Sequence, residues 1–178
     1  MALRHDEFVG AGVRIVGISV DSPARNAAMI DKLDLPFEML SDPDGTGLLK
    51  ELDVWQPDTS HGDIGRPGVF VVHPDGSEQF RQVARDFADR IPEGDLLARV
   101  RSLELSPTEQ APVAHVDPEP GEEAMPVQAL LPYCRGAKFA AKAMGMRHPE
   151  AKDDAARYIE QMDRYMEAVR TLRARIGA

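Results

Sequence analysis

A run of eight mostly apolar residues, positions 13–20, is the clearest hydrophobic segment in the first half of the chain. It is rich in β-branched side chains and bounded by Gly12 and Asp21, which predicts a central strand buried on both faces, of the kind that helices cover. The preceding segment LRHDEF (residues 3–8) predicts the last turns of a helix that ends at Gly10 or Gly12. A helix followed by a buried strand is therefore expected at the start of the chain.

Two cap-and-proline pairs predict the next two helices. Ser22 followed by Pro23 is typical of a helix N-terminus, and so is Asp42 followed by Pro43. A short strand, PFEML (residues 36–40), separates the two helices. The first helix has its apolar face at Ala27, Ile30 and Leu33, and the second at Leu48, Leu49 and Leu52.

The following segment predicts a β-hairpin and a closing helix. After a loop, VWQPDTSHGDIGR (residues 54–66), the run at 67–84 carries Asp75-Gly76, a two-residue turn signal between β-favouring segments. A helix starting at Pro92 buries Leu96, Leu97, Val100 and Leu103. The order β-α-β-α-β-β-α predicts an α/β three-layer sandwich with a mixed sheet.

The composition then changes twice, which predicts three parts: a domain over residues 1–105, a linker over 106–126 and a helical extension over 127–178. The linker is dense in proline and acid and poor in apolar residues, so it cannot bury enough surface to offset its ordering entropy. The last segment has an amphipathic face at Ile159, Met162, Met166, Val169, Leu172 and Ile176. A helical hairpin that packs on the domain or on a partner chain is expected.

Charge and cysteine content narrow the function classes. The net charge of −9 and the pI near 5.0 repel phosphate backbones and anionic lipids, so neither nucleic acid nor membrane is an expected partner. No apolar run approaches the roughly 20 residues of a membrane span, and the N-terminus lacks the pattern of a signal peptide. The single cysteine, Cys134, fits a reducing environment. We therefore expect a cytoplasmic protein.

Most motifs that carry chemistry are absent from the sequence. The histidines are scattered without metal-ligand spacing, at positions 5, 61, 73, 115 and 148. The segment DPDGTG (residues 42–47) has acidic oxygens but no continuing calcium-loop pattern, so a helix cap is the better interpretation. No glycine-rich phosphate loop or serine nucleophile elbow is present. We expect neither a metal nor a cofactor.

Three segments in order resemble one family. GVRIVGISVDSP (residues 12–23), LPFEMLSDPDG (35–45) and RPGVFVVHPDG (66–76) are similar to the redoxin branch of the thioredoxin-fold superfamily, the peroxiredoxins and the alkyl hydroperoxide reductase/thiol-specific antioxidant (AhpC/TSA) proteins. The similarity covers about residues 1–103. It implies a thioredoxin-like fold, thiol-dependent reduction of peroxides or disulfides in an antioxidant role, and a thiol reductant, either thioredoxin or a small thiol, as partner.

The resemblance also implies a cysteine that this sequence does not contain. In the family, the peroxide-reducing cysteine begins the helix before the GVRIVGISVDSP strand, where this chain has only the tail of a helix. The thioredoxin-like sheet is therefore expected to lack its N-terminal strands, and the chain is expected to be inactive as a peroxidase. Two explanations stay open. Either an expression boundary or a misassigned start codon removed the segment, or the chain is a non-catalytic binding or assembly module that uses its C-terminal helices, for example in a homodimer.

Three residues are candidates for the site. By resemblance, Arg66 would stabilise the thiolate and the peroxide oxygen, and Pro67 would carry a cis peptide bond beside the site. The alternative for Arg66 is a loop arginine that pairs with an acidic neighbour. Cys134 has Arg135 and Lys138 near it in sequence, which would favour a thiolate, although most lone cysteines on apolar helical segments are small buried hydrophobes.

Overall fold

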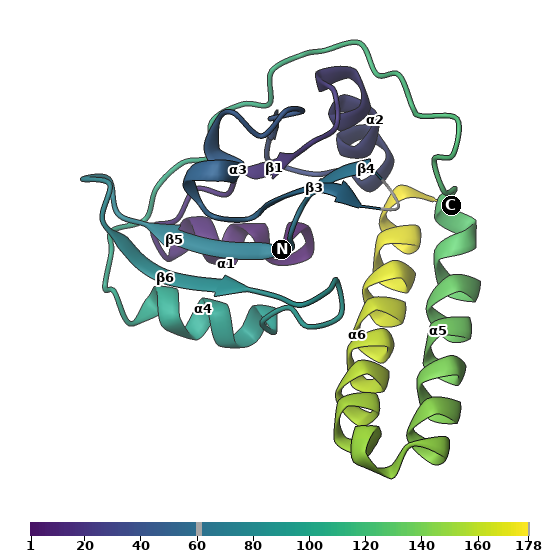
Figure 1. Ribbon diagram of the computed structural model, residues 1–178. Helices are drawn as coiled ribbons and strands as arrows, with labels where there is room; N and C mark the ends of the chain where they lie inside the picture. The colour runs from purple at the N-terminus through teal and green to yellow at the C-terminus, as the bar shows by residue number, and fades with distance from the viewer. Residues whose placement is uncertain (60–61, 178) are drawn as a thin grey trace. The chain divides into compact units, whose positions relative to one another are not determined.

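Short helices and strands alternate up to residue 101, and the chain is helical from residue 127 onwards (Figure 1). The computed structural model describes residues 1–59 and 62–177. It divides the chain into two compact units, Met1–Gly121 and Glu122–Ala178. The first unit mixes α and β structure and the second is a helical extension, so the predicted fold class is confirmed.

The first helix ends where the sequence predicted. A short 3-10 turn, η1 (Ala2–Arg4), leads into α1 (His5–Gly10), and the N–H of Gly12 donates to the carbonyl of Val9 at 3.0 Å. Gly12 has φ +85°, a left-handed conformation that glycine adopts without strain. A Cβ at this position would lie 2.5 Å from the Cβ of Leu105. The close approach of a later segment therefore requires glycine here as much as the turn does.

The first strand is shorter than predicted. β1 (Gly17–Ser19) pairs in parallel with β2 (Met39–Ser41), which confirms a parallel pair joined by a helix, α2 (Pro23–Leu33). Ser22 caps α2, since its Oγ accepts a hydrogen bond from the N–H of Arg25 at 3.3 Å. The prediction of a central strand over 13–20 is wrong. Among the described residues, β1 pairs with β2 alone. The backbone N–H and carbonyl of Ile15 form hydrogen bonds with a side chain from the predicted linker instead of with another strand.

That side chain belongs to residues 105–110, which we call the strap. The Gln110 amide acts as a neighbouring strand would, since its Oε1 accepts from the N–H of Ile15 at 2.9 Å and its Nε2 donates to the Ile15 carbonyl at 3.0 Å. The N–H of Thr108 donates to the carbonyl of Val9 at 3.1 Å. The strap is thus part of the N-terminal unit, although the composition of the segment predicts a free linker.

Replacing Gln110 with alanine is expected to destabilise this unit by about 1–2 kcal/mol, because both backbone groups of the buried Ile15 would lose their partner. Urea unfolding followed by the fluorescence of the single tryptophan, Trp55, measures the effect. Glu109→Ala, on the exposed side of the strap, is the matched control and should change stability by less than about 0.5 kcal/mol. Equal midpoints for the two variants would contradict the role of the strap.

The second capped helix starts later than predicted. α3 (Leu48–Glu51) does not begin at Pro43, because residues 42–45 form a turn in which the N–H of Gly45 donates to the Asp42 carbonyl at 3.1 Å. Asp42 still caps the helix from a distance. Its carboxylate accepts from the N–H groups of Gly47 and Leu49, both at 2.9 Å. The interpretation of DPDGTG as a helix cap therefore agrees with these bonds, but with five residues between cap and helix.

The predicted loop over 54–66 contains a strand pair instead. β3 (Trp55–Thr59) and β4 (Gly62–Gly65) are antiparallel, with Trp55 opposite Gly65. Pro57 and the polar residues of this segment hide the pairing, since the period-two hydrophobic pattern of a strand is missing. Ser60 and His61, part of the same predicted loop, lie outside the described residues.

The predicted β-hairpin is confirmed, with a different turn. β5 (Gly68–Val72) pairs with β6 (Glu78–Val83), and the N–H of His73 donates to the Ser77 carbonyl at 2.8 Å. The last register pair is Val72 with Glu78, so residues 73–77 connect the strands and the turn is longer than two residues. Gly76, at φ +88°, supplies the left-handed residue that such turns need.

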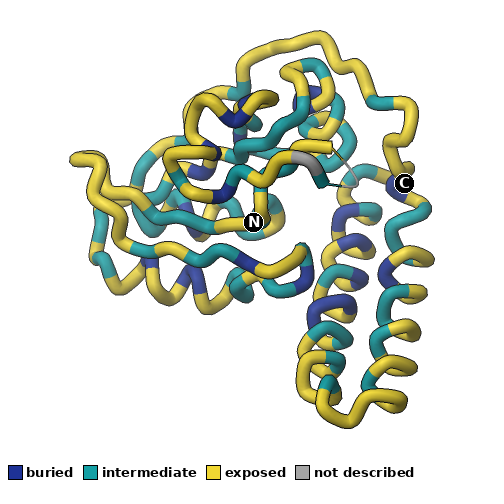
Figure 2. Tube along the Cα trace, viewed as in Figure 1, coloured by how far each residue is buried: buried dark blue, intermediate teal, exposed yellow. Residues whose placement is uncertain are grey.

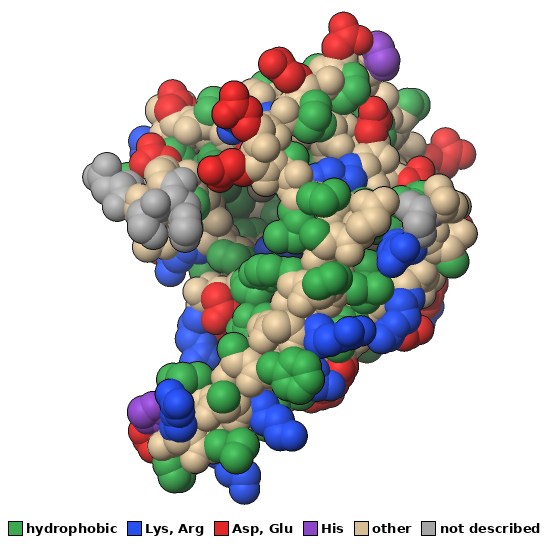
Figure 3. Space-filling view, turned by 90° about the vertical axis from the view of Figure 1, so that its right-hand side faces the viewer, with side chains coloured by type: hydrophobic (Ala, Val, Ile, Leu, Met, Phe, Trp, Pro, Cys, Tyr) green, Lys and Arg blue, Asp and Glu red, His purple; other side chains and the backbone are tan. Residues whose placement is uncertain are grey.

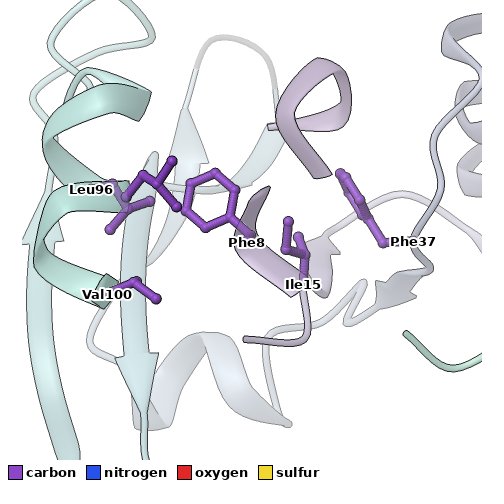
Figure 4. Packing of buried hydrophobic residues seen from close by; sticks show 6 residues of the cluster. Phe8, Ile15, Phe37, Leu96 and Val100 are labelled. Carbon is purple, nitrogen blue, oxygen red and sulfur yellow. The ribbon is translucent and has the colours of Figure 1, made fainter. Parts of the chain in front are cut away.

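The core of the N-terminal unit joins α1, β5, β6 and α4 (Glu93–Arg101). Figure 4 shows Phe8 of α1 between Leu96 of α4 and Ile15. Figure 2 shows that the buried positions of α4 lie along one side of the helix. The buried cluster consists of Phe8, Ile15, Phe37, Leu96, Leu97 and Val100, and Val69, Val71 and Phe80 of the hairpin pack against it. The predicted core face of α4 is confirmed at 96, 97 and 100, whereas Leu103, predicted with them, lies beyond the end of the helix and is half-buried.

The C-terminal unit is the predicted helical hairpin. α5 (Val127–Arg147), η2 (Pro149–Ala151) and α6 (Lys152–Ile176) follow one another, and Lys138 of α5 forms an ion pair with Asp163 of α6 at 2.6 Å. The predicted apolar face of α6 is buried at Met162, Met166, Val169 and Leu172. In the described part of the chain, no helix combines the length and the apolar character that crossing a bilayer requires.

Candidate functional site

Arg66 and Pro67 form the short connection between β4 and β5. Two backbone hydrogen bonds hold the connection. The N–H of Arg66 donates to the carbonyl of Val54 at 2.8 Å, and the carbonyl of Pro67 accepts from the N–H of Ala84 at 2.7 Å. The two candidates therefore share one rigid segment on the N-terminal unit.

The guanidinium of Arg66 binds the end of α3. Helix α3 stops in a Schellman motif, in which Asp53 adopts φ +55° and the N–H of Val54 donates to the Leu49 carbonyl at 2.9 Å. Arg66 Nη2 donates to the carbonyl of Asp53, and Arg81 Nη1 donates to the carbonyl of Leu52 at 2.8 Å. Two cations thus bind the carbonyls of the two residues that directly follow α3, at the negative end of the helix.

This geometry adds a local role to Arg66 that the sequence did not predict. Among the described residues, its partner is a backbone carbonyl and not the acidic side chain of the simpler alternative. The side chain is exposed, so a guanidinium proton not used at Asp53 is accessible to an anion. The role of Arg66 beside a thiolate stays a prediction.

The cis peptide bond predicted before Pro67 is absent, since no peptide bond among the described residues is cis. The hydrogen bonds of Arg66 and Pro67 to Val54 and Ala84 hold the chain extended from β4 into β5. The trans form, which X-Pro bonds favour by about 0.5–1 kcal/mol, is compatible with that path. The prediction of a cis Pro67 is therefore wrong.

Cys134 lies on α5, in the other compact unit, and its residue is 5% exposed. Burial raises the pKa of the Cys134 thiol, so the thiolate that attacks peroxides is disfavoured. The ammonium of its neighbour Lys138 is held by Asp163 on α6. Cys134 has the surroundings of a small buried hydrophobe, and the structure does not bring it together with Arg66 in one unit.

Cys134 is expected to react slowly with iodoacetamide at pH 8 in the native chain, and at least about tenfold faster in denaturant. The reason is that unfolding removes both the steric cover and the desolvation that raises the thiol pKa. Mass spectrometry of quenched time points measures the two rates. Equal rates in buffer and in denaturant would show that the thiol is accessible and would reopen a chemical role for it.

A polar cluster that the sequence did not predict lies at the carboxyl ends of the parallel strands. The side chain of Asn26, which is buried on α2, accepts from the Ser19 hydroxyl at 2.8 Å and donates to the Ser41 Oγ at 3.1 Å and the Leu40 carbonyl at 3.2 Å. Ser19 and Ser41 are register partners of β1 and β2. The only signal in the sequence is a polar residue beside the apolar face of the helix. Its bonds fasten α2 to both strands.

The described residues hold no group of three or more His, Cys, Asp or Glu side chains that could bind a metal ion. His61, one of the scattered histidines, lies outside the described residues. The N-terminal unit offers an exposed arginine at the β4–β5 connection, Arg66, whose guanidinium is hydrogen-bonded to the carbonyl of Asp53 after α3.

Comparison with known proteins matches the first part of the chain. The sequence model described as the AhpC/TSA family matches residues 1–79, a range that includes Arg66, Pro67 and the turn of the β5–β6 hairpin. No curated protein matches the chain.

Proposed function

We propose that this chain, whose residues 1–79 match the sequence model of the AhpC/TSA family, carries in its N-terminal unit a redoxin domain of thiol peroxidase and disulfide oxidoreductase lineage. The family match supports the domain type and the class of chemistry. The finer steps of the proposal concern this particular chain: whether it reduces peroxide itself, and which residues would take part.

The 178-residue chain by itself does not reduce peroxide. The observation that supports this part of the proposal is the burial of Cys134 and the raised pKa of its thiol. Reduction of a peroxide needs a thiolate, because serine and threonine hydroxyls do not ionise near neutral pH. Cys134 is the only cysteine of the sequence, and burial raises the pKa of its thiol. We infer that this sequence supplies the scaffold of a redoxin site without its nucleophile.

In a protein that does carry the thiolate, Arg66 would provide the positive charge beside it. Its backbone is fixed by Val54 and its guanidinium by the carbonyl of Asp53, so the charge is preorganised. The reductant would be thioredoxin or a small thiol. The single cysteine supports a reducing compartment such as the cytoplasm.

The test is a protein extended at its N-terminus by a strand and a cysteine loop of an AhpC/TSA protein, joined to residue 1. Peroxide turnover should appear and should be lost when the added cysteine is changed to serine. Arg66→Ala should then lower kcat/KM by about 100-fold, as loss of a charge donor to a developing anion does, and Arg66→Lys should restore part of it.

Arg90→Ala is the matched control, because Arg90 is an exposed arginine of the same unit with no bond to α3. The urea midpoint followed by Trp55 fluorescence distinguishes two effects of Arg66→Ala. Loss of the hydrogen bond to the Asp53 carbonyl lowers the midpoint, whereas loss of the positive charge beside the thiolate leaves it unchanged. If Arg66→Ala and Arg90→Ala leave the same activity in the extended protein, the role of Arg66 fails.

A second candidate function is a binding or assembly module that uses the C-terminal helices. The observation that favours it is the large exposed apolar side chains of α5, Phe139 and Met146 among them. A monomeric soluble protein rarely exposes such side chains as a contiguous patch without a binding role.

A further inference from the structure

Helix α5 has a hydrophobic surface that the helical hairpin leaves uncovered. Phe139 is 66% exposed and Met146 is 77% exposed, and Pro132 is also exposed on the same helix. These three residues are seven apart, which places them on one line along the helix, because seven residues make almost two turns. Figure 3 shows apolar side chains following this helix on the side turned to the viewer.

The same surface carries only positive charge. No Asp or Glu occurs from Ala124 to Pro149, while Arg135 and Lys142 each stand four residues before a member of the apolar line and so lie beside it. Lys and Arg side chains flank the apolar ones in Figure 3. Lys138 is paired with Asp163, whereas no described residue forms an ion pair with Arg135 or Lys142.

We propose that this α5 outer face, defined by Pro132, Arg135, Phe139, Lys142 and Met146, docks an acidic amphipathic helix of a partner protein. The seven-residue spacing of the apolar line fits the seam of a second helix packed at a shallow angle. The line from residue 132 to residue 146 is about 21 Å long, which matches about four turns of a partner helix. Glu or Asp at the flanks of that helix would meet Arg135 and Lys142.

Charge decides against a second copy of this chain as the occupant of this face. In a pair of α5 helices from two copies of this chain, Arg135 and Lys142 would face the same cations of the partner, and like charges at such positions oppose association. An anionic lipid surface would be attracted by the same two cations, so the vesicle measurement below distinguishes it from a partner helix. This proposal rests on the binding-module candidate above and is independent of peroxide chemistry, so the two can fail separately.

The experiment uses the full chain and a fluorescein-labelled synthetic peptide of about three heptads, with Leu at a and d and Glu at e and g, read out by anisotropy. A matched peptide with Lys at e and g is the charge control. The Glu peptide should bind at least about tenfold more tightly, and binding should weaken several-fold when salt is raised from about 0.1 M to 0.5 M. Phe139→Ser and Lys142→Glu should each lose about tenfold in affinity.

Two control variants lie away from the α5 outer face. Val72→Ser removes an exposed apolar side chain at the end of β5, and Arg170→Glu reverses an exposed charge on α6. Both should bind the Glu peptide as the unmodified chain does, and far-ultraviolet circular dichroism should show that the Phe139→Ser and Lys142→Glu variants keep their helices.

Several outcomes would overturn the proposal. They are equal binding of the Glu and Lys peptides, no binding of the Glu peptide, and binding that Phe139→Ser leaves intact. A chain that is dimeric by light scattering and becomes monomeric with Phe139→Ser would assign the face to a second copy. Sedimentation with phosphatidylserine-containing vesicles that depends on Phe139 would assign the face to lipid.

Discussion

The purified 178-residue chain should reduce hydrogen peroxide and tert-butyl hydroperoxide no faster than a blank, with either thioredoxin or glutathione as reductant. The reason is chemical. Peroxide reduction by a redoxin needs an accessible thiolate, and the one thiol of this sequence is buried with a raised pKa. NADPH consumption in a coupled assay measures the rate, and a peroxiredoxin assayed in parallel shows that the coupling enzymes work.

The variant Cys134→Ser makes this expectation sharper. Because Cys134 fills a small buried space, the substitution should change stability slightly and the peroxidase rate not at all. Turnover by the unmodified chain that Cys134→Ser abolishes would move the active site to α5. Turnover that survives the substitution would require a nucleophile other than a thiol, and it would refute the thiol-based interpretation altogether.

Local signals were enough to predict much of the fold. Ser22 with Pro23 marked the start of α2, Asp75-Gly76 marked the β5–β6 hairpin, and the spacing of Leu96, Leu97 and Val100 marked the core face of α4. In each of these cases the interacting groups are close in sequence. Propensity and hydrophobic periodicity therefore contain the relevant information.

The predictions that failed depend on contacts between residues that are not adjacent in sequence. The strand expected over 13–20 is reduced to Gly17–Ser19, because the backbone of Ile15 is hydrogen-bonded to the side chain of Gln110, 95 residues later, and not to a neighbouring strand. A single glutamine in a proline-rich, acidic segment gives no signal of that contact. Asp42 likewise caps α3 across a turn. The prediction placed the start of the helix too early, because it took the adjacent Pro43 as the first helical residue.

The candidate site likewise combines features that the local sequence predicts with features that depend on tertiary contacts. The resemblance located Arg66 and Pro67, since the motif around them is continuous in sequence. It could not predict that Arg66 binds the carbonyl of Asp53, because that carbonyl is free only once α3 ends in a left-handed residue. It also predicted a cis Pro67, whereas bonds to Val54 and Ala84, on two different segments, hold an extended connection.

The largest loss of stability is expected from Phe8→Ala. Phe8 is 0% exposed and packs at the centre of the cluster between α1 and α4 (Figure 4). Removing a fully buried phenylalanine costs about 3–5 kcal/mol, because the transfer free energy of the ring is lost and a cavity remains. That is a large part of the about 5–15 kcal/mol that stabilises a typical domain. The urea midpoint followed by Trp55 should fall by about 2 M.

Phe139→Ala is the matched control for this prediction, since it removes the same ring from an exposed position on α5. Trp55 lies on β3 with Lys50 Nζ 5.5 Å from the centre of its ring, so its fluorescence reports on the N-terminal unit. The free energy of unfolding of the control should stay within about 0.5 kcal/mol of that of the unmodified chain. A Phe8→Ala midpoint as high as that of the control would mean that the Phe8 ring is not a structural centre of the N-terminal unit. The packing of α1 against α4 in the N-terminal unit would then have to be revised.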